Sequence, residues 1–276
     1  MVMNDYKLEV IYFDNSELLE SCEIDNINNL LYFVSIHKQL VYCYDIKSGE
    51  IHSMKTNGPV GCVRVKNFKK VIIADISGIY EMDFSNFSIR KIDDFVDEEN
   101  VRFNDGLIDP KGRFLIGTMG YPDIINGVGK LYSYFDGSYK ILINNVTISN
   151  GIAISDDATK LFYIDTPTKK VVKYKYDINS GVISEKSELI EFTNDSYPDG
   201  MSIDINGNLY IAEWGGGAIS KWNSDDGKLI EKYNLPVINI TSCAIDKDKN
   251  LYITTAKSEK KDEQFGGALF YLKFKS

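Results

Sequence analysis

Short apolar runs recur along the chain at nearly constant spacing. Each run begins with Leu, Val or Phe and continues mainly with apolar residues. The six copies are Leu31–Val34, Val71–Ala74, Phe114–Gly117, Leu161–Ile164, Leu209–Ala212 and Leu251–Thr254. Between their first residues the spacings are 40, 43, 47, 48 and 42 positions. A period of roughly 40–50 residues indicates propeller blades or another repeat array.

The residues around each run follow a common order that predicts three or four short strands per unit. A second strand precedes the run, and the residues between them, such as Asp109–Gly112 and Asp204–Gly207, are typical of hairpin turns. Alternation with period 2 predicts a third strand downstream, for example at Val171–Tyr176. A weaker fourth strand follows in most copies, as at Leu229–Tyr233.

These units predict an all-β fold, a six-bladed β-propeller with four-stranded antiparallel blades. We expect residues 1–276 to form a single domain. The segment Leu8–Phe13 reads as a strand without a unit of its own, and we expect it to complete the last blade. A seven-bladed propeller or a β-sandwich is the alternative, but six clean copies favour six blades.

One position in each unit is a candidate for a ring of polar side chains. It lies five residues before the polar turn position, at the start of the strand expected nearest to the central axis. The residues at this position, called here the ring register, are Glu20, Gly61, Asn104, Asn150, Asp199 and Thr241. Five of these six side chains carry an oxygen atom. Residues at one register on radially repeated strands form a ring around the axis.

The oxygen atoms of the ring register predict a site for one divalent cation. Carboxylates that converge in an apolar scaffold are costly to bury without a partner, and a cation removes that cost. Oxygen ligands without Cys or His favour hard cations. Calcium is the favoured ion, and magnesium, manganese and zinc are the others considered. Alternatively, these residues are polar turn formers around a water-filled channel.

Composition narrows the function further. The formal net charge of −9 and the lack of a basic stripe argue against nucleic-acid and membrane partners. The polar N-terminal residues Met1–Lys7 lack the apolar stretch of a signal peptide, so we expect a cytoplasmic protein, either a monomer or a weak homodimer. The four cysteines show no metal-ligand spacing, and we expect them to be reduced and buried.

Several motifs share their order and spacing with a known family. They are Arg102–Gly106, Asp109–Arg113, Gly117–Met119, Ser149–Ala153, Asp165–Pro167, Pro198–Met201, Trp214–Gly217 and Thr241–Ala244. With them the chain resembles the regucalcin/gluconolactonase (senescence-marker protein) family of six-bladed propellers, from about Leu18 to Tyr271. The resemblance implies a metal-dependent lactone hydrolase whose substrate is a small lactone.

The resemblance also implies particular site residues. The family's Glu, Asn and Asp metal ligands fall on Glu20, Asn150 and Asp199, and its substrate-contacting Arg and Asn fall on Arg102 and Asn104. In related propellers that Asn also coordinates metal. The sequence around Glu20 departs from the family pattern, which makes Glu23 the alternative ligand.

The substrate contacts are less closely matched than the metal ligands. An acidic contact of some family members is replaced here by Gly120–Pro122. We expect Tyr121 and Trp214 near the mouth of the channel, Tyr121 as a substrate contact. The segment Met119–Lys130 is longer than the other links within units, and it is expected either to form a lid over that mouth or to be a surface loop.

The expected reaction is hydrolysis of a sugar lactone, such as an aldonolactone, by cation-activated water, with Asp199 as general base. Arg102, Asn104 and Thr241 would bind ring hydroxyls, whereas acyl-homoserine or long-chain lactones would need an apolar groove that these residues do not supply. Alternatively, Arg102 forms a surface ion pair with the acidic run 93–99. The competing functions are a metal-dependent phosphotriesterase or esterase at the same site, and a non-catalytic calcium-binding or interaction propeller. No Gly-x-Ser-x-Gly motif supports a serine hydrolase.

Overall fold

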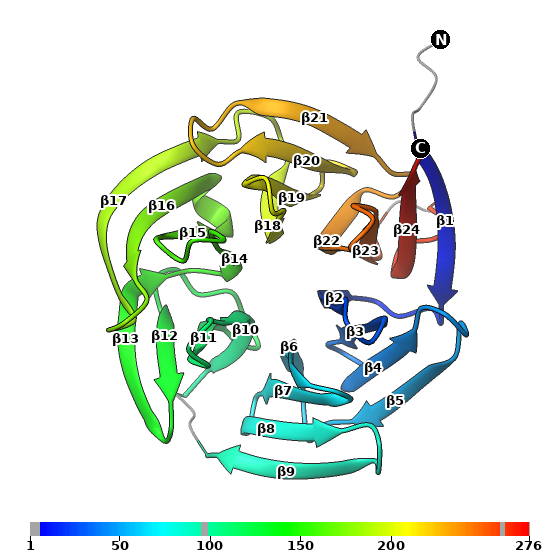
Figure 1. Cartoon of the computed structure of the whole chain (residues 1–276), viewed down its shortest axis with the longest axis horizontal. Helices are drawn as coiled ribbons and strands as arrows, with labels where there is room; N and C mark the ends of the chain where they lie inside the picture. The colour runs from blue at the N-terminus through cyan, green and yellow to red at the C-terminus, as the bar shows by residue number, and fades with distance from the viewer. Residues whose placement is uncertain (1–5, 95–98, 260–262, 276) are drawn as a thin grey trace.

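The structure is a computed structural model that describes residues 6–94, 99–259 and 263–275. Within these ranges, four-stranded antiparallel sheets are arranged around a central axis as six blades (Figure 1). The predicted fold class is therefore confirmed. Most of the polar N-terminal stretch (residues 1–5) and the middle of the acidic run (95–98) lie outside the described residues.

Each blade has the same order of strands from the axis outward. The innermost strands are β2 (Leu19–Asp25), β6 (Val60–Asn67), β10 (Val101–Ile108), β14 (Ser149–Ile154), β18 (Tyr197–Ile203) and β22 (Asn239–Ile245). The second strands are β3 (Leu30–Ser35), β7 (Lys70–Asp75), β11 (Phe114–Gly120), β15 (Lys160–Asp165), β19 (Asn208–Trp214) and β23 (Leu251–Ala256). The third strands are β4 (Leu40–Asp45), β8 (Gly78–Asp83), β12 (Gly129–Phe135), β16 (Lys170–Asp177), β20 (Ala218–Asn223) and β24 (Ala268–Phe274). The outermost strands are β5 (Ile51–Lys55), β9 (Ser88–Asp93), β13 (Ser138–Val146), β17 (Val182–Glu191), β21 (Leu229–Asn234) and β1 (Tyr6–Phe13).

The ring closes by pairing the two ends of the chain. Strand β1 runs antiparallel to β24, with Tyr6 opposite Phe274 and Phe13 opposite Ala268. The last sheet therefore has the order β1–β24–β23–β22. This confirms that the strand at Leu8–Phe13 completes the last blade. Because the ring is closed, every blade packs against a neighbouring blade on both sides.

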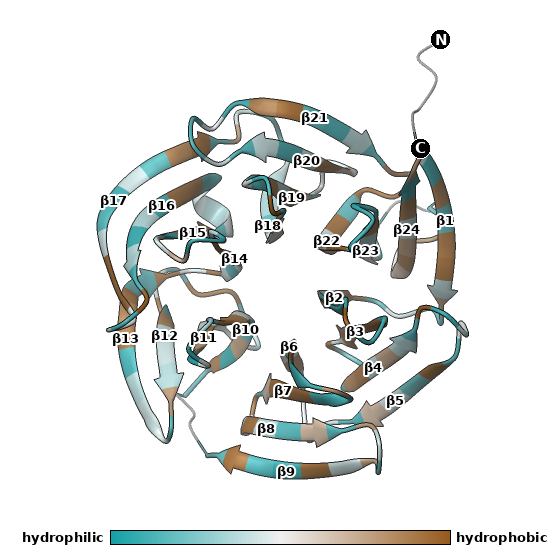
Figure 2. Cartoon of the chain, viewed as in Figure 1, coloured by the Kyte–Doolittle hydropathy of each residue, from teal (hydrophilic) through white to brown (hydrophobic). Residues whose placement is uncertain are grey.

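The hydrophobic core lies between neighbouring blades. The apolar runs of the sequence form the second strands, and every residue of β3 and β23 is buried. One cluster joins Tyr32 of β3 to Val63 of β6, which belong to adjacent sheets. In Figure 2, hydrophobic and hydrophilic stretches alternate along many strands. The predicted buried cysteines are all buried and none forms a disulfide.

A bulge interrupts the pairing of each innermost strand at the ring register. The register shifts lie between Glu20 and Glu23 in β2, and between Asn150 and Ile152 in β14. The other four innermost strands shift at the equivalent place. A bulge bends its strand and turns side chains toward a new direction, and bulges are common beside active sites. The ring register is therefore set apart by backbone geometry as well as by polar side chains.

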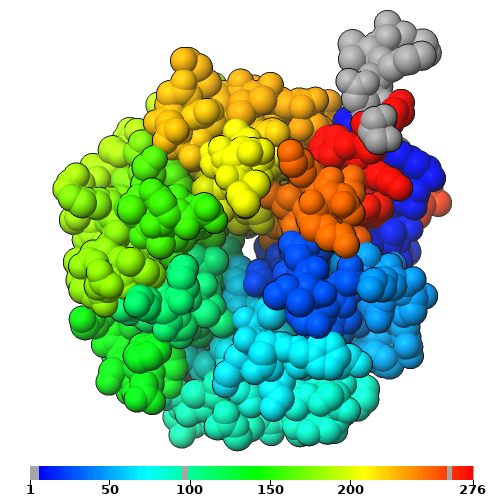
Figure 3. Space-filling model, in the orientation of Figure 1, coloured from blue at the N-terminus to red at the C-terminus, as the bar shows by residue number. Residues whose placement is uncertain are grey.

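Glycines after the ring register allow the innermost strands to approach each other. A Cβ atom on Gly151 would lie 2.7 Å from the carbonyl oxygen of Asp199, and one on Gly200 would lie 2.7 Å from that of Thr241. Both glycines lie within strands, and so do Asn150 and Asp199, which precede them, so these residues do not form turns. The space-filling view shows a hollow at the centre of the ring (Figure 3). The described part of the chain has no helix with the length and apolarity needed to cross a membrane.

Candidate active site in the central channel

A cavity of about 340 Å³ lies at the end of the channel where the innermost strands begin. Its polar lining residues include four of the six ring-register residues. These are Glu20, Asn104, Asn150 and Asp199, accompanied by Arg102 and Thr166. The structure thus brings together every metal ligand expected from the sequence, together with the expected arginine.

Asp199 is a buried carboxylate without a full set of partners. It is 5% exposed, and its Oδ1 atom has no hydrogen-bond partner among the residues that the structure describes. Burial raises the pKa of Asp199 well above its usual range, and repulsion from Glu20 and Asp105 raises it further. A buried polar atom without a partner costs free energy in the folded state, so this position calls for a proton or a cation.

Glu20 is the second carboxylate of the cavity. Its Oε2 accepts a hydrogen bond of 2.9 Å from the backbone N–H of Ser21. Burial raises the pKa of Glu20 to about 8, and repulsion from Asp105 adds to that rise. The charge of Glu20 also raises the pKa of Asp199, and a bound cation would favour the charged form of both carboxylates.

Hydrogen bonds fix the orientation of the Asn150 amide. Its Nδ2 donates to Thr166 Oγ1 at 3.0 Å, and Thr166 Oγ1 in turn donates to the carbonyl oxygen of Pro198 at 2.9 Å. Thr166 begins the short 3-10 helix η1 (Thr166–Thr168), which follows β15. Since Nδ2 is engaged with Thr166, the Oδ1 atom is the end of the amide that can serve as a ligand.

Arg102 and Asn104 form a hydrogen-bonded pair in the cavity. Arg102 Nη1 donates to Asn104 Oδ1 at 2.8 Å and to the carbonyl oxygen of Phe103 at 2.9 Å. Asn104 Nδ2 donates to the carbonyl oxygen of Ser149 at 2.8 Å. Burial lowers the pKa of Arg102 to about 10, partly offset by Glu20, so the guanidinium stays charged at neutral pH. Asn104 thus orients Arg102 toward the cavity.

Three residues expected at the site lie outside this cavity's lining. Tyr121 is close enough to Arg102 to influence its pKa but does not line the cavity. Thr241 is fully buried and donates its hydroxyl to the carbonyl oxygen of Leu19 at 2.6 Å. Glu23, the alternative to Glu20, lines a separate cavity where the innermost strands end. Trp214 does line the site, as expected for a residue near the mouth.

Mostly apolar residues outside the ring register form the rest of the lining. Three of them, Leu18, Ile148 and Tyr197, lie two positions before a ring-register residue. Successive residues of a strand alternate in direction, so a residue two positions earlier lies on the same side. The repeat alone could therefore have found this layer. Ile124, from the long Met119–Lys130 segment, also lines the cavity.

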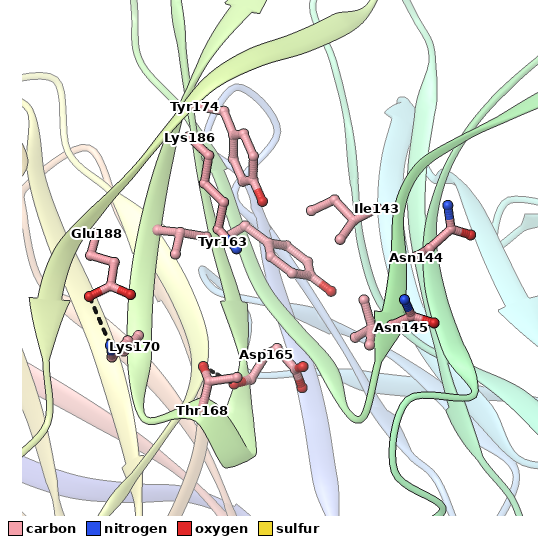
Figure 4. Close-up of a pocket in the computed structure, with 12 residues that line it drawn as sticks. Ile143, Asn144, Asn145, Tyr163, Asp165, Thr168, Lys170, Tyr174, Lys186 and Glu188 are labelled. Atoms are coloured by element: carbon pink, nitrogen blue, oxygen red, sulfur yellow. Dashed lines mark hydrogen bonds and ion pairs between the residues drawn. The ribbon is translucent and has the colours of Figure 1, made fainter.

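Two other cavities are less suited to catalysis. One of about 420 Å³ lies between the blades of β13 and β16, away from the axis (Figure 4). There Lys170 and Glu188 pair at 2.8 Å, and Asp165 accepts a backbone N–H at 2.9 Å from Ile148. The other, of about 380 Å³, contains the charged pair of Arg64 and Glu23. Their charges have protein partners, whereas Asp199 has an oxygen atom without one.

The channel site fits a cation through carboxylate and amide oxygens. Among the residues that the structure describes, no three His, Cys, Asp or Glu side chains form a cluster. A cation here would therefore depend on two carboxylates, Glu20 and Asp199, together with the Asn150 amide. Such an oxygen set suits calcium, magnesium or manganese. The partnerless Oδ1 of Asp199 supports the fit.

The fold and this site define a six-bladed propeller with an acidic pocket in its central channel. Residues 18–257 match the family described as SMP-30/Gluconolactonase/LRE-like region. Regucalcin of Danio rerio is 33% identical over 261 residues, covering 92% of this chain and 88% of that protein. The chain therefore belongs to the SMP-30/gluconolactonase/LRE-like family.

Two further relatives support this assignment. YvrE of Bacillus subtilis, whose name proposes a sugar lactone lactonase, is 32% identical and covers 89% of this chain and 87% of its own length. The structure of a luciferin-regenerating enzyme superposes with a TM-score of 0.88 at 26% identity, covering 97% of this chain and 95% of that one.

Proposed function

We propose that this protein hydrolyses a lactone in the channel cavity with a divalent cation, calcium being favoured, held by Glu20, Asn150 and Asp199. The observation that carries the proposal is the buried Asp199 carboxylate, which has an unpartnered oxygen and lies close enough to Glu20 for repulsion. Family membership supports sugar lactone hydrolysis in general. The cation is the finer part of the proposal, and the aldonolactone expected from the sequence would find hydrogen-bond partners among the polar residues of the ring register and Arg102.

The side chains divide the reaction between them. A bound divalent cation would polarise the lactone carbonyl and make a water molecule more acidic. Asp199 accepts a proton from the attacking water, whose oxygen forms a bond to the carbonyl carbon. The bond between that carbon and the ring oxygen then breaks, and the ring oxygen takes up the proton held by Asp199, which leaves a hydroxy acid and regenerates the carboxylate.

Arg102 positions the substrate in this scheme. Its guanidinium donates to ring hydroxyls or to the carboxylate of the product, while Asn104 holds it in place at 2.8 Å. A non-catalytic calcium-binding propeller would not require this arginine. The alternative role of Arg102 was an ion pair with the acidic run 93–99, of which residues 95–98 lie outside the described residues; within those described, Arg102 Nη1 donates to Asn104 and to the backbone of Phe103.

A panel of substrates assayed with and without a chelator tests the proposal. Lactones, a phosphotriester and a simple aryl ester are each incubated with the protein and calcium, then with EDTA, then with calcium restored. We expect lactone turnover to fall by at least about a hundredfold with EDTA and to return with the metal. Lactone turnover that EDTA leaves unchanged contradicts the cation, and turnover of the phosphotriester alone favours the competing enzyme class.

A further inference from the structure

The layer above the ring register is mostly apolar where it lines the cavity. In the three blades that supply Glu20, Asn150 and Asp199, the residue two positions earlier is Leu18, Ile148 or Tyr197, and each lines the cavity. In the blade of Asn104 the equivalent residue is Arg102, the charged member of this layer in the cavity. The ring-register residues of the cavity are called here its floor. A substrate that contacts this floor therefore meets mainly apolar side chains as it extends toward the mouth.

Other apolar side chains extend this layer, and together with Leu18, Ile148 and Tyr197 they are called here the wall of the cavity. Ile36 follows β3, Met119 lies near the end of β11, and Pro167 lies in η1. Trp214 ends β19, and Ile124 reaches the cavity from the segment between β11 and β12. These residues come from different blades, so the wall surrounds the cavity instead of forming a single patch.

The wall decides which substituents a lactone ring can carry. A hydroxyl that leaves water and meets hydrocarbon without a hydrogen-bond partner loses free energy. An alkyl group in the same place gains it, because apolar surface leaves water on both sides. The volume of about 340 Å³ is near the lower end of the roughly 300–1,000 Å³ typical of small-molecule sites. It leaves room for a lactone ring with a short side group.

We propose that the preferred substrate is a lactone whose ring carries a short apolar substituent, with any hydroxyls confined to the edge that faces Arg102. This inference rests on the proposed lactonase function and refines its substrate. The carbonyl lies at the floor beside Glu20 and Asp199, and the substituent packs against the wall that includes Ile148 and Ile124. A fully hydroxylated aldonolactone matches the floor but not the wall.

A matched series of six-membered lactones tests this proposal. The calcium-loaded protein is assayed on δ-valerolactone, on the same ring with a methyl or a propyl group beside the ring oxygen, and on gluconolactone. Each methylene that enters the wall contributes roughly a three- to fourfold increase in kcat/KM. We expect the propyl lactone to exceed both δ-valerolactone and gluconolactone by at least about tenfold.

Two isoleucines of one loop provide the variant and its control. Ile124 lines the cavity and is 61% exposed, so its substitution leaves the core intact, whereas its neighbour Ile125, 42% exposed, does not line it. Ile124→Ser is expected to lower the ratio of kcat/KM for the propyl lactone to that for δ-valerolactone by roughly fivefold. Ile125→Ser is expected to leave this ratio unchanged.

The outcomes separate this inference from the proposed function. A higher kcat/KM for gluconolactone than for the propyl lactone overturns the inference and leaves lactone hydrolysis standing. Equal effects of Ile124→Ser and Ile125→Ser also overturn it, because the wall would then not contact the substituent. Absence of turnover on every lactone, with the calcium-loaded protein folded by circular dichroism, overturns the proposed function and this inference together.

Discussion

The channel contains two neighbouring groups of charged residues that are built in opposite ways. The first group, at the ring register, contains the carboxylates of Glu20 and Asp199. The second, farther along the innermost strands, contains the carboxylates of Glu23 and Asp105 with the guanidinium of Arg64. Both groups place two acidic side chains in the channel, but the second also contains a basic one that pairs with them.

The two carboxylates of the second group share one basic partner within the protein. Arg64 is 7% exposed, and its Nη2 lies 2.6 Å from Asp105 Oδ1 while its Nε lies 4.0 Å from Glu23 Oε2. Its Nη1 also donates to Ser21 Oγ at 2.6 Å. Burial alone would lower the pKa of Arg64, but Asp105 and Glu23 outweigh burial and raise it. Each carboxylate of this group therefore has a basic partner within the protein.

Among the described residues, no basic side chain forms an ion pair with the ring-register carboxylates, although the charges of Arg102 and Arg64 partly offset the rise in the pKa of Glu20. Arg102 is nearby, but its Nη1 donates to Asn104 and to the backbone. Burial raises the pKa of both Glu20 and Asp199, as does the charge of Asp105. The difference teaches that acidic residues in a channel do not by themselves indicate a metal site. The indication comes from carboxylates that form no ion pair with a basic side chain. This difference distinguishes the candidate catalytic centre from the structural ion pair of Arg64.

The largest effect is expected from removing Asp199. Asp199→Ala deletes both a proposed ligand and the proposed base, so lactone kcat/KM should fall by at least about a thousandfold. The metal-free protein should keep its stability, because the lost carboxylate was repelled by Glu20. Activity and the urea midpoint without metal are measured in parallel. Asp195→Ala, which removes an exposed carboxylate four residues earlier, is the control; similar losses in both variants would contradict the assignment.

A large effect on stability is expected from Arg64. Arg64→Met leaves Asp105 and Glu23 without their buried partner, and breaking such a pair costs about 3–5 kcal/mol in the free energy of unfolding. Urea denaturation measures this loss. The control is Lys66→Met, a substitution on the same strand as Arg64. It removes an exposed partner of Glu81 and should cost less than about 1 kcal/mol. If the two variants unfold alike, Arg64 does not neutralise the second group.

A smaller effect is expected when pH is varied without metal. The pKa of Glu20 is raised to about 8 in the folded state from an ordinary value of 4.5. Between these values the unfolded chain loses from Glu20 a proton that the folded chain keeps, so the contribution of Glu20 to stability falls as pH rises, by at most about 1.4 kcal/mol per unit. Urea midpoints at several pH values measure the slope, which Glu20→Gln should reduce. Calcium should also reduce it, and an identical slope with calcium would contradict binding at Glu20.

The fold could be predicted from the sequence because each blade repeats its local chemistry. The apolar runs became the second strands, and counting from the polar turns reached the innermost strands correctly in all six units. The second unit lacks an acidic turn residue, yet Gly61 lies in β6 at the equivalent bulge. Periodicity succeeded because it compares the chain with itself and needs no knowledge of contacts between blades.

Parts of the site were missed because they depend on contacts between blades. The hydroxyl of Thr241 donates to the carbonyl oxygen of Leu19 in the neighbouring blade. The sequence of the repeat that contains Thr241 does not reveal this contact. The apolar layer with Leu18 and Ile148 was passed over because only oxygen-bearing positions were considered. Arg64 was missed as well, although it lies three positions after the ring register, as Glu23 does in the neighbouring unit. Opposite charges at one register of adjacent repeats are a signal that the sequence did contain.

The smallest effect is expected from Arg102, and it sharpens the comparison from the side of the substrate. If its guanidinium is reserved for ligand hydroxyls, Arg102→Ala should raise KM for a hydroxylated lactone about tenfold more than for δ-valerolactone, with little change in kcat. A guanidinium that instead served to neutralise Glu20 would, when removed, weaken both substrates equally and raise the apparent affinity for calcium. The pKa of Arg102, lowered to about 10 by burial, keeps it charged throughout the neutral range, so the difference in KM should not vary between pH 6 and 8. Steady-state kinetics on both lactones, with Arg90→Ala as an exposed-arginine control, separates the two roles.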